Sequence, residues 1–309
     1  IVVEAREENP TVPSWVGEQL PRSFDLSWEI GKFRARMERL IKTGRLDDAG
    51  RLLIEEYDAD ENIVRNVLRY FGDQVKYLGV VPNHRRIVIE RWIDEYGRRH
   101  IVFHAAYGRR TCDALARFFA YVASEMYSCN VGIGVTDNGF DLVFPRWVDP
   151  DPRSILGEAM AMDFVSTLRR AIRNTELFLN RFRHVANRSF MILRRYKGTE
   201  ISVRKQRIRA SVLVSLLPED FPVIKETYRE VLEDYMDLPH AQEIYEAIRS
   251  GKIRVVIAEK KDERTLSPFA QGIVLAALSD VLTMAERERW ILAMYERMVE
   301  KLRGEGKSS

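Results

Sequence analysis

Apolar residues recur at every third or fourth position in the first part of the chain, a spacing that places them on one face of a helix. One such set is Ile30, Phe33, Met37 and Leu40. The pattern predicts three helices, over about residues 28–42, 45–57 and 60–78. Residues 1–27 hold three prolines near several aromatic residues and predict an extended arm instead.

The middle of the chain is rich in Ile, Val and aromatic residues, which is typical of strands. Residues 86–95 and 100–107 predict one hairpin, and residues 131–136 and 140–144 predict another. Asp137-Asn138-Gly139 supplies the turn of the second hairpin. Between the hairpins, helical spacing predicts a helix over residues 110–127 whose inner face is Leu115, Phe118, Phe119, Val122 and Met126.

Three prolines between positions 145 and 152 predict a boundary between lobes near residues 146–155. Beyond it the pattern is mostly helical, over about residues 161–182, 184–196, 202–216, 222–236, 239–250 and 284–303. A short strand over 253–258 interrupts the helices, and residues 304–309 predict a disordered tail.

These elements predict an α+β fold in which a small antiparallel sheet with flanking helices precedes a mostly helical lobe. The domains that follow are an arm (1–27), a helical segment (28–80), a hairpin–helix–hairpin core (81–150), a mostly helical lobe (151–303) and a tail (304–309).

The composition, 46% hydrophobic and 31% charged over 309 residues, is that of a folded globular protein with a substantial core. No stretch reaches the roughly 18 uninterrupted apolar residues that a membrane helix needs, and the first residues lack a secretory signal. Cys112 and Cys129 are too few for a disulfide framework or a four-ligand zinc site. We therefore expect a cytoplasmic protein without membrane contact.

Charge is unevenly distributed, although the formal net charge is only +3. Residues 181–209 contain ten basic residues and one acidic residue, whereas residues 219–246 contain nine acidic and two basic residues. A basic block beside an acidic block predicts either a site for a polyanion or two segments that neutralise each other. The two alternatives differ in whether the basic side chains face solvent or the acidic helices.

No catalytic or metal-binding motif stands out. The sequence has no G-x-x-x-x-G-K-[ST] loop for nucleotide phosphates and no dinucleotide fingerprint. Asp137, Asp141, Asp149 and Asp151 imitate a nuclease metal cluster, but turn and loop chemistry explains them better. We expect no enzyme activity from this chain alone, with no catalytic residue, metal site or cofactor of its own.

Two sets of arginines are candidate phosphate contacts. Gly108-Arg109-Arg110-Thr111 follows a strand and opens a helix, where free N–H groups favour an anion. The alternative is that these arginines pair with acids or brace neighbouring carbonyls. The second set lies in the basic block, with seven-residue steps that predict a stripe along a helix, and consists of Arg181, Arg188, Arg195, Arg204 and Arg207. For this set the alternative is a scaffold in which the arginines meet the acidic helices.

Trp15 is the candidate for contact with a base. It lies on the predicted arm between Pro13 and Gly17, a setting that suits stacking on an unpaired base. The alternative is a hydrophobic plug that holds the arm against the body.

Several segments form a distinctive ordered set. In chain order they are P-T-V-P-S-W-V-G-E at 10–18, V-F-H at 102–104, G-R-R-T-C-D-A-L at 108–115, D-N-G-F at 137–140, R-F-R-H at 181–184, F-P-V-I-K-E-T-Y-R-E at 221–230 and S-P-F-A at 267–270. Together they resemble the Lhr-type (large helicase-related) superfamily 2 helicases. Each motif is weak alone, but the ordered set spans nearly the whole chain. Cys112 departs from the family, which usually has Asn there, and this puts any hydrogen bond of that Asn in question.

The resemblance implies the DEAD-associated region that follows two RecA-like motor domains and a winged helix, and that encloses the single strand on which the motor moves 3′ to 5′. ATP and magnesium would bind the absent motor domains. The implied partners are single-stranded DNA or RNA and the motor domains, in cis or in trans. Trp15 would stack on a base, the five arginines of the basic block would hold phosphates, and Arg109 and Arg110 rank lower. The alternative function is a structural module that docks on the motor or another partner with little nucleic-acid contact.

Overall fold

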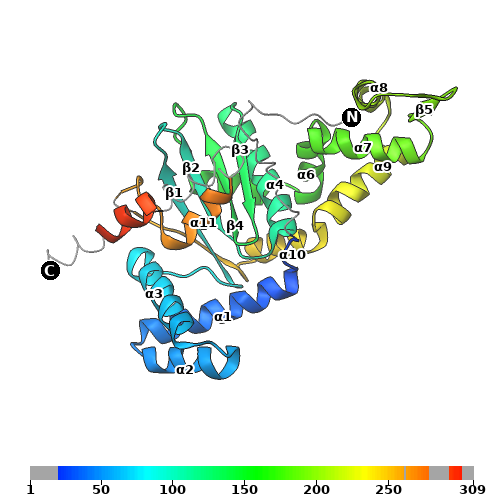
Figure 1. The fold of residues 1–309 in the computed structure, drawn as a ribbon. Coiled ribbons are helices and arrows are strands. Elements are labelled where there is room, and N and C mark those ends of the chain that lie inside the picture. The colour runs from blue at the N-terminus through cyan, green and yellow to red at the C-terminus, as the bar shows by residue number, and fades with distance from the viewer. Residues whose placement is uncertain (1–19, 261, 278–291, 301–309) are drawn as a thin grey trace, which may run out of the picture.

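A five-stranded sheet lies at the centre of the fold (Figure 1). The computed structural model describes residues 20–260, 262–277 and 292–300. The strands, in the spatial order β3-β4-β2-β1-β7, are β1 (Arg86–Ile93), β2 (Arg99–His104), β3 (Gly132–Thr136), β4 (Gly139–Phe144) and β7 (Arg254–Ile257). Both predicted hairpins, β1–β2 and β3–β4, are confirmed, and so is the α+β fold class.

The sheet is mixed rather than purely antiparallel, because β7 pairs parallel with β1. The sequence predicts a strand here but assigns it to the helical lobe. In the structure Arg254 lies opposite Arg86, and Ile257 lies opposite Ile89. A parallel pair requires a long crossover between its strands. In the sequence, β1 and β7 are separated by β2 to β4 and by the helices of the second half. The predicted helical lobe is therefore largely an insertion between two strands that are neighbours in the sheet.

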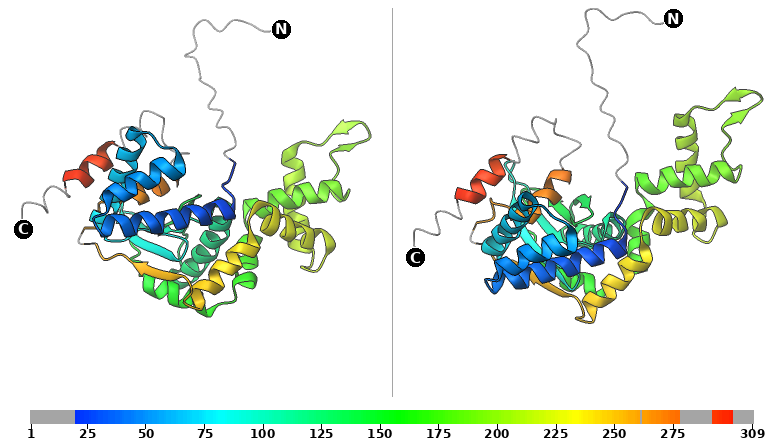
Figure 2. Two further views of the ribbon diagram at one scale, coloured as in Figure 1. Left: turned by 90° about the horizontal axis from the view of Figure 1, so that it is seen from below. Right: turned by 60° about the horizontal axis from the view of Figure 1, so that its bottom comes forward.

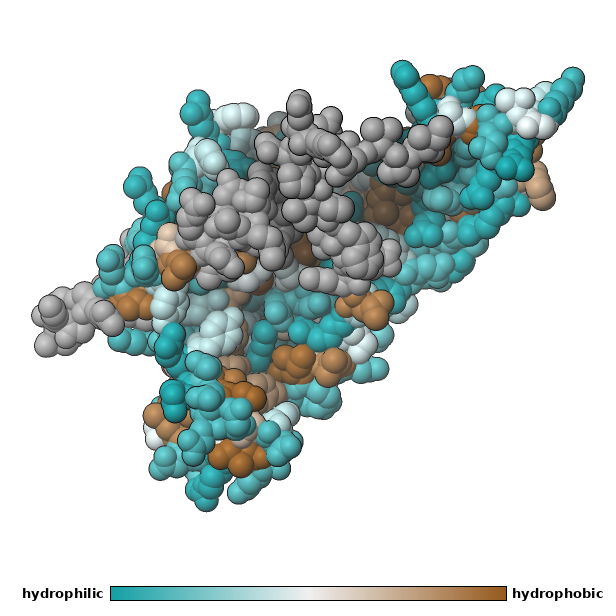
Figure 3. Space-filling model, viewed as in Figure 1, coloured by the Kyte–Doolittle hydropathy of each residue, from teal (hydrophilic) through white to brown (hydrophobic). Residues whose placement is uncertain are grey.

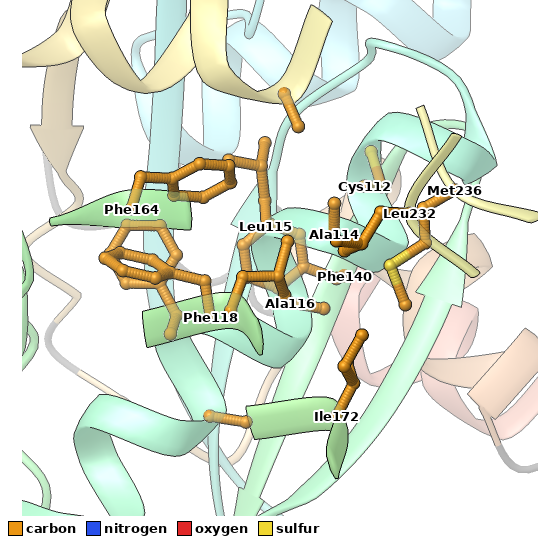
Figure 4. Packing of buried hydrophobic residues seen from close by; sticks show 14 of the residues in the cluster. Cys112, Ala114, Leu115, Ala116, Phe118, Phe140, Phe164, Ile172, Leu232 and Met236 are labelled. Carbon is orange, nitrogen blue, oxygen red and sulfur yellow. The ribbon is translucent and has the colours of Figure 1, made fainter. Parts of the chain in front are cut away.

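Helix α4 (Arg109–Tyr127) packs on one face of the sheet and forms the main core with it (Figure 4). Phe118 and Phe119 are buried, and the Phe118 ring lies 4.8 Å from that of Phe164. The predicted inner face of this helix is confirmed except at Met126, which is partly exposed. The same buried cluster continues from the sheet into the helices of the second half.

The three predicted N-terminal helices are α1 (Phe24–Lys42), α2 (Leu46–Tyr57) and α3 (Glu61–Leu78). They form a smaller core of their own. Helix α1 begins within the predicted arm, because the Ser23 hydroxyl accepts the Leu26 N–H and caps it. Phe24 is therefore a helix residue, and its ring stacks on His240 at 4.0 Å.

The helices of the second half follow the predictions over 202–216, 222–236 and 239–250 closely, but the two predictions before them differ from the structure. These helices are α5 (Pro152–Ala161), α6 (Phe164–Arg173), α7 (Glu176–Arg188), α8 (Val203–Leu216), α9 (Pro222–Arg229), the π-helix η1 (Glu230–Tyr235) and α10 (Leu238–Arg249). The predicted helix over 161–182 is wrong, because Asp163 and Thr175 each cap a new helix within it. Pro152 starts α5 rather than ending an element, since proline fits the first turn of a helix.

The predicted helix over 184–196 is also wrong beyond Arg188. The chain turns there and forms a small hairpin of β5 (Arg195–Tyr196) and β6 (Thr199–Glu200). Lys197 and Gly198 have positive φ angles of 49° and 79°, the conformation of a tight two-residue hairpin turn. Arg195 therefore lies on a strand, and the predicted stripe of Arg181, Arg188 and Arg195 is not continuous along one helix.

Helix α11 (Pro268–Ala277) covers the other face of the sheet, where it packs with Trp92 and Val102. Residues 292–300 are helical, in agreement with part of the helix predicted over 284–303. The rest of that prediction, the tail at 304–309 and most of the N-terminal arm lie outside the described residues.

Helices α7 and α8, with the β5–β6 hairpin between them, project away from the sheet (Figure 2). We call residues 176–216 the hairpin lobe. It contains most of the basic block, so its surface decides between the two roles that the sequence leaves open for the arginines.

Candidate nucleic-acid interface

The hairpin lobe is held together by a narrow contact between its two helices. The Thr175 hydroxyl caps α7, and the Ser202 hydroxyl caps α8. Within α8 the buried residues are Gln206 and Ala210, and Gln206 accepts a hydrogen bond from the Asn187 amide of α7 at 3.1 Å. Most of the α8 surface therefore faces solvent, and Figure 3 shows both hydrophilic and hydrophobic residues on this part of the molecule.

On α7, Arg181 and Arg188 meet the acidic segment. Both pair with Glu230, the first residue of η1, with 3.4 Å between Arg181 Nη1 and Glu230 Oε2. Glu230 is only 4% exposed. A buried carboxylate is strongly unfavourable without cationic partners, so these arginines are committed to the fold.

Arg195 and Arg207 have partners that lie in solvent. Arg195 pairs across the small hairpin with Glu200 at 2.7 Å, and Arg207 pairs with Glu176 at the start of α7. All four side chains are well exposed. Exposed ion pairs stabilise a protein by at most about 1 kcal/mol, so a phosphate can replace either carboxylate at little cost.

Apart from Lys197, which lies over the Tyr196 ring, four exposed cations of the lobe have no hydrogen-bond or ion-pair partner within the described part of the chain. These lobe cations are Arg194, Arg204, Lys205 and Arg209. Arg194 belongs with the start of α8, because its carbonyl accepts the Ile201 N–H at 2.8 Å. Arg194 is not among the site residues predicted from the sequence, although its position in the basic block could have identified it as a candidate.

The pKa of His184 responds to the positive charges around it. His184 is exposed on α7 and accepts a contact from Arg183 Nη2 at 2.9 Å. Partial burial lowers the pKa of His184, and the positive charges of four arginines, Arg194 among them, lower it further. The surface of α7 around His184 is therefore positive, which favours a polyanionic partner.

The strand-to-helix junction at Gly108 is already occupied by a carboxylate of the chain itself. Asp137 Oδ1 accepts the Arg109 N–H at 2.8 Å and the Arg22 N–H at 3.0 Å. Arg22 also donates to the Asp137 carbonyl and to Asn138 Oδ1. The D-N-G turn therefore caps α4 and fixes the chain at the end of the N-terminal arm.

Gly108 permits this close approach. Its φ is +88°, and a Cβ added there would lie 2.6 Å from the Arg22 carbonyl oxygen. The following Arg110 donates to the η1 carbonyls of Glu233 at 2.6 Å and Asp234 at 2.9 Å, and to that of Met236 at 2.9 Å. It thus satisfies carbonyls at the end of the π-helix, which have no partner within a helix. Arg109 is only partly exposed.

Cys112, in the same junction, forms a hydrogen bond through its thiol. Its thiol is fully buried and donates to the Ala105 carbonyl, with Sγ 2.9 Å from the oxygen. Burial raises the pKa of this thiol to about 12, so it stays protonated. Trp15, the predicted base-stacking residue, lies outside the described residues.

A buried polar network under α11 was not found by sequence reasoning. Glu90 of β1 accepts from Ser267 Oγ at 2.6 Å, and it contacts His104 Nε2 at 3.0 Å and Lys260 Nζ at 3.1 Å. Burial acts to raise the pKa of Glu90, but Lys260, His104 and Ser267 outweigh it and hold the pKa at about 2. The network ties Lys260 and Ser267 to the sheet. Its signals in the sequence are Glu90 and His104, ionisable residues within or at the end of apolar strands.

His100 forms a second buried pair on the sheet. Its Nδ1 lies 2.7 Å from Asp141 Oδ2, and its Nε2 lies 3.5 Å from Asp94 Oδ2. Burial acts to lower the pKa of His100, but the two carboxylates raise it to about 9. His100 is a charged structural residue, and among the described residues no group of three or more His, Cys, Asp and Glu side chains is arranged to hold a metal.

Residues 81–270 match the family model described as DEAD/H associated. The chain therefore belongs to the DEAD/H associated family. The match covers the sheet, the hairpin lobe and the start of α11.

Among curated relatives, the ATP-dependent helicase Lhr-Core of Saccharolobus solfataricus is 40% identical over 312 residues, which cover 99% of this chain and 35% of the relative. Lhr-Core protein 2 of Thermococcus barophilus is 37% identical over 97% of this chain and 34% of its own length. The chain thus spans about a third of the length of these relatives. It is similar to a region of these Lhr-type helicases, in agreement with the sequence motifs.

The structure of Mycobacterium smegmatis helicase Lhr bound to ssDNA and AMP-PNP is similar to this fold, with a TM-score of 0.67 and 26% identity. The similarity covers 86% of this chain and 33% of that one. Within the described segments, no helix is both long and apolar enough to cross a membrane.

Proposed function

We propose that this chain is an accessory nucleic-acid-binding region of a 3′–5′ ATP-dependent helicase, and that it holds single-stranded DNA or RNA and aids strand separation. The single observation that carries the proposal is the set of lobe cations without partners on an exposed surface. Basic side chains that meet no acid in the fold are available to phosphates. ATP and magnesium would act in motor domains outside this chain, in the cytoplasm.

The relatives support the proposal. The curated relatives are named as ATP-dependent helicases, and the solved relative was determined with ssDNA and AMP-PNP. A region that is similar over nearly all of its length is expected to serve the same kind of motor. The RecA-like and winged-helix domains would be its partners, in cis or in trans.

In this proposal the predicted residues differ in how directly they contact the nucleic acid. Arg204 and its neighbouring lobe cations make the first phosphate contacts, while Arg195 and Arg207 exchange a carboxylate for a phosphate. Arg181 and Arg188 position η1 through Glu230, and phosphate contact by them is secondary. Trp15 stacks on a base. Arg109 and Arg110 rank last as phosphate contacts, because the junction that they open is capped by Asp137.

The test is fluorescence anisotropy of a labelled 20-mer single strand across a salt titration. The test variant carries the changes Arg204→Ala, Lys205→Ala and Arg209→Ala. We expect its affinity to fall at least about tenfold, and the dependence of binding on salt to become less steep, because fewer counterions are released. Unchanged affinity would overturn the proposed role of the lobe.

A matched control removes the same charges elsewhere. Arg39, Arg65 and Lys252 are exposed residues on α1, on α3 and before β7, again two arginines and one lysine. Their joint replacement by alanine is expected to change affinity by no more than about twofold. An equal loss in both variants would mean that binding follows net charge alone, without an interface on the lobe.

The second candidate function is docking on the motor or on another protein. The observation that favours it is a set of exposed apolar side chains on α8, namely Val203, Ile208, Val212 and Leu216. In that case Ile208→Asp would weaken assembly with separately expressed motor domains and leave strand binding unchanged. Pull-down with the motor domains, beside the anisotropy measurement, separates the two functions.

A further inference from the structure

Two aromatic side chains of the hairpin lobe, which also carries the lobe cations, are exposed to solvent. Phe190 follows the end of α7 and is 80% exposed, and Tyr196 lies on β5 and is 59% exposed. Neither ring has an aromatic partner among the described residues, and neither contributes to a buried cluster. Large exposed aromatic groups in a basic setting are typical of surfaces that stack on bases.

Phe190 is held in a backbone conformation that suits glycine. Its φ is +59°, in the left-handed region that bulky residues rarely adopt. It occupies the position after the cap of α7, where many helices have glycine. Folding therefore gains nothing from this side chain, through either its backbone or its burial. Strain of this kind concentrates at functional sites.

Tyr196 has a positive environment that another exposed tyrosine lacks. Lys197 Nζ lies 5.6 Å from the centre of the Tyr196 ring, and Arg194 and Arg195 precede it. Tyr96, in the turn between β1 and β2, is 78% exposed and has Arg98 over its ring at 5.4 Å. The residues before Tyr96, however, are Asp94 and Glu95. The two tyrosines have similar exposure and similar cation contacts, but only Tyr196 lies in a surface that attracts phosphates.

We propose that Phe190 and Tyr196 form a base-stacking site for unpaired nucleotides, with the lobe cations holding the phosphates of the same strand. This proposal rests on the proposed function and adds a site on the hairpin lobe where unpaired bases stack. Stacking is open to every base, so the site selects single strands over duplexes without selecting a sequence. The site does not include Trp15, the base-stacking residue that the sequence predicts.

The experiment compares two labelled probes, a 20-mer of thymidine and an otherwise identical strand in which the bases are absent. Tyr196→Ala is expected to weaken binding of the thymidine strand about fivefold and to leave binding of the abasic strand unchanged, because only stacking requires bases. Tyr196→Phe keeps the ring and is expected to bind as the wild type does. Tyr96→Ala is the matched control and is expected to change neither affinity.

Phe190→Gly separates binding from folding. Relief of the left-handed strain is expected to raise the Tm by about 1–2 °C, while binding of the thymidine strand falls about threefold or more. A variant that is at least as stable as wild type but binds the bases less well cannot be explained by misfolding.

The outcomes distinguish the two proposals. If Tyr196→Ala and Phe190→Gly weaken both probes equally, or neither probe, the base-stacking site is overturned, even when the variant lacking Arg204, Lys205 and Arg209 still binds poorly. Equal binding of a duplex and a single strand by the wild type would overturn it as well. If no variant or wild-type protein binds either probe at low salt, the proposed function itself fails.

Discussion

Helices α7 and α8 come from one basic block, yet their arginines have opposite surroundings. On α7, Arg181 and Arg188 converge on the buried carboxylate of Glu230. On α8, Arg204 and Arg209 have no acid to pair with in the described part of the chain. The same residue type, at similar density in the sequence, is structural on one helix and available for ligands on the other.

The cause of the difference lies outside both helices. Glu230 begins η1 and lies against α7, whereas α8 contacts α7 and projects beyond the acidic segment. Charge density along a sequence thus predicts where a polyanion site can be. The acidic side chains that the fold brings next to the site decide which of its cations remain available to bind phosphate.

The largest predicted effect comes from removing the acid that makes the difference. Glu230→Gln leaves Arg181 and Arg188 without a charged partner, and we expect the free energy of unfolding to fall by about 2–3 kcal/mol. Strand binding is expected to tighten about two- to threefold, because two arginines become available. Urea unfolding and anisotropy measure the two effects, and Glu226→Gln, at an exposed pair with Arg229, is the control.

The free energy of unfolding should depend on pH through His100 of the sheet and not through the hairpin lobe. The pKa of His100 is raised from 6.5 to about 9 in the fold, so its charge stabilises the protein fully below pH 6.5. That contribution is lost as the pH rises through about 9, on the order of 2 kcal/mol in all. Urea unfolding between pH 6 and 9.5 checks this, and a His100→Gln variant should show a flatter profile. An equally steep profile in the variant would contradict the assignment.

A smaller effect is predicted for the exposed pair of Glu176 and Arg207. This pair is intermediate between the arginines that pair with buried Glu230 and the lobe cations that have no acidic partner among the described residues. Glu176→Gln frees Arg207 and is expected to change the free energy of unfolding by less than about 0.5 kcal/mol. Strand affinity should rise by less than about twofold. A loss of stability as large as that of Glu230→Gln would show that exposure does not separate structural from available arginines in this lobe.

The smallest predicted effect is a change in the titration of His184. Nearby arginines lower its pKa, and a bound phosphate would offset their charge. We therefore expect the pKa of His184 to rise by a few tenths on binding of a single strand, as followed by NMR of its ring protons. An unchanged titration at saturating strand would place the strand away from α7 and α8.

Local signals in the sequence predict the hairpins and the helices of the first half well. Alternating strands, the Asp137-Asn138-Gly139 turn and regular helical spacing are short-range patterns, and the structure follows them. The β5–β6 hairpin was missed because its strands are two residues long and its Lys197-Gly198 turn is flanked by basic residues without alternation. The parallel position of β7 depends on contacts with a strand more than 150 residues earlier, which no local pattern encodes.

The candidate site shows the same limit. The basic block located the lobe, but the pairing of Arg188 with Glu230 and the role of Arg110 at the end of η1 depend on tertiary contacts. Helical periodicity also assigns Arg195 to the helix predicted over 184–196, because a turn at Phe190 with a left-handed backbone is not expected for that residue type. Family motifs identified the region correctly without showing which arginines remain available.

The most direct test compares two double variants from the one basic block, Arg204→Ala with Arg209→Ala, and Arg181→Ala with Arg188→Ala. The measurement is the slope of log affinity against log salt for a labelled single strand. We predict that the α8 pair lowers the slope by about 1.4, or about 0.7 for each phosphate that the protein no longer neutralises, and that the α7 pair lowers stability without changing the slope. A slope lowered as much by the α7 pair as by the α8 pair would contradict the account.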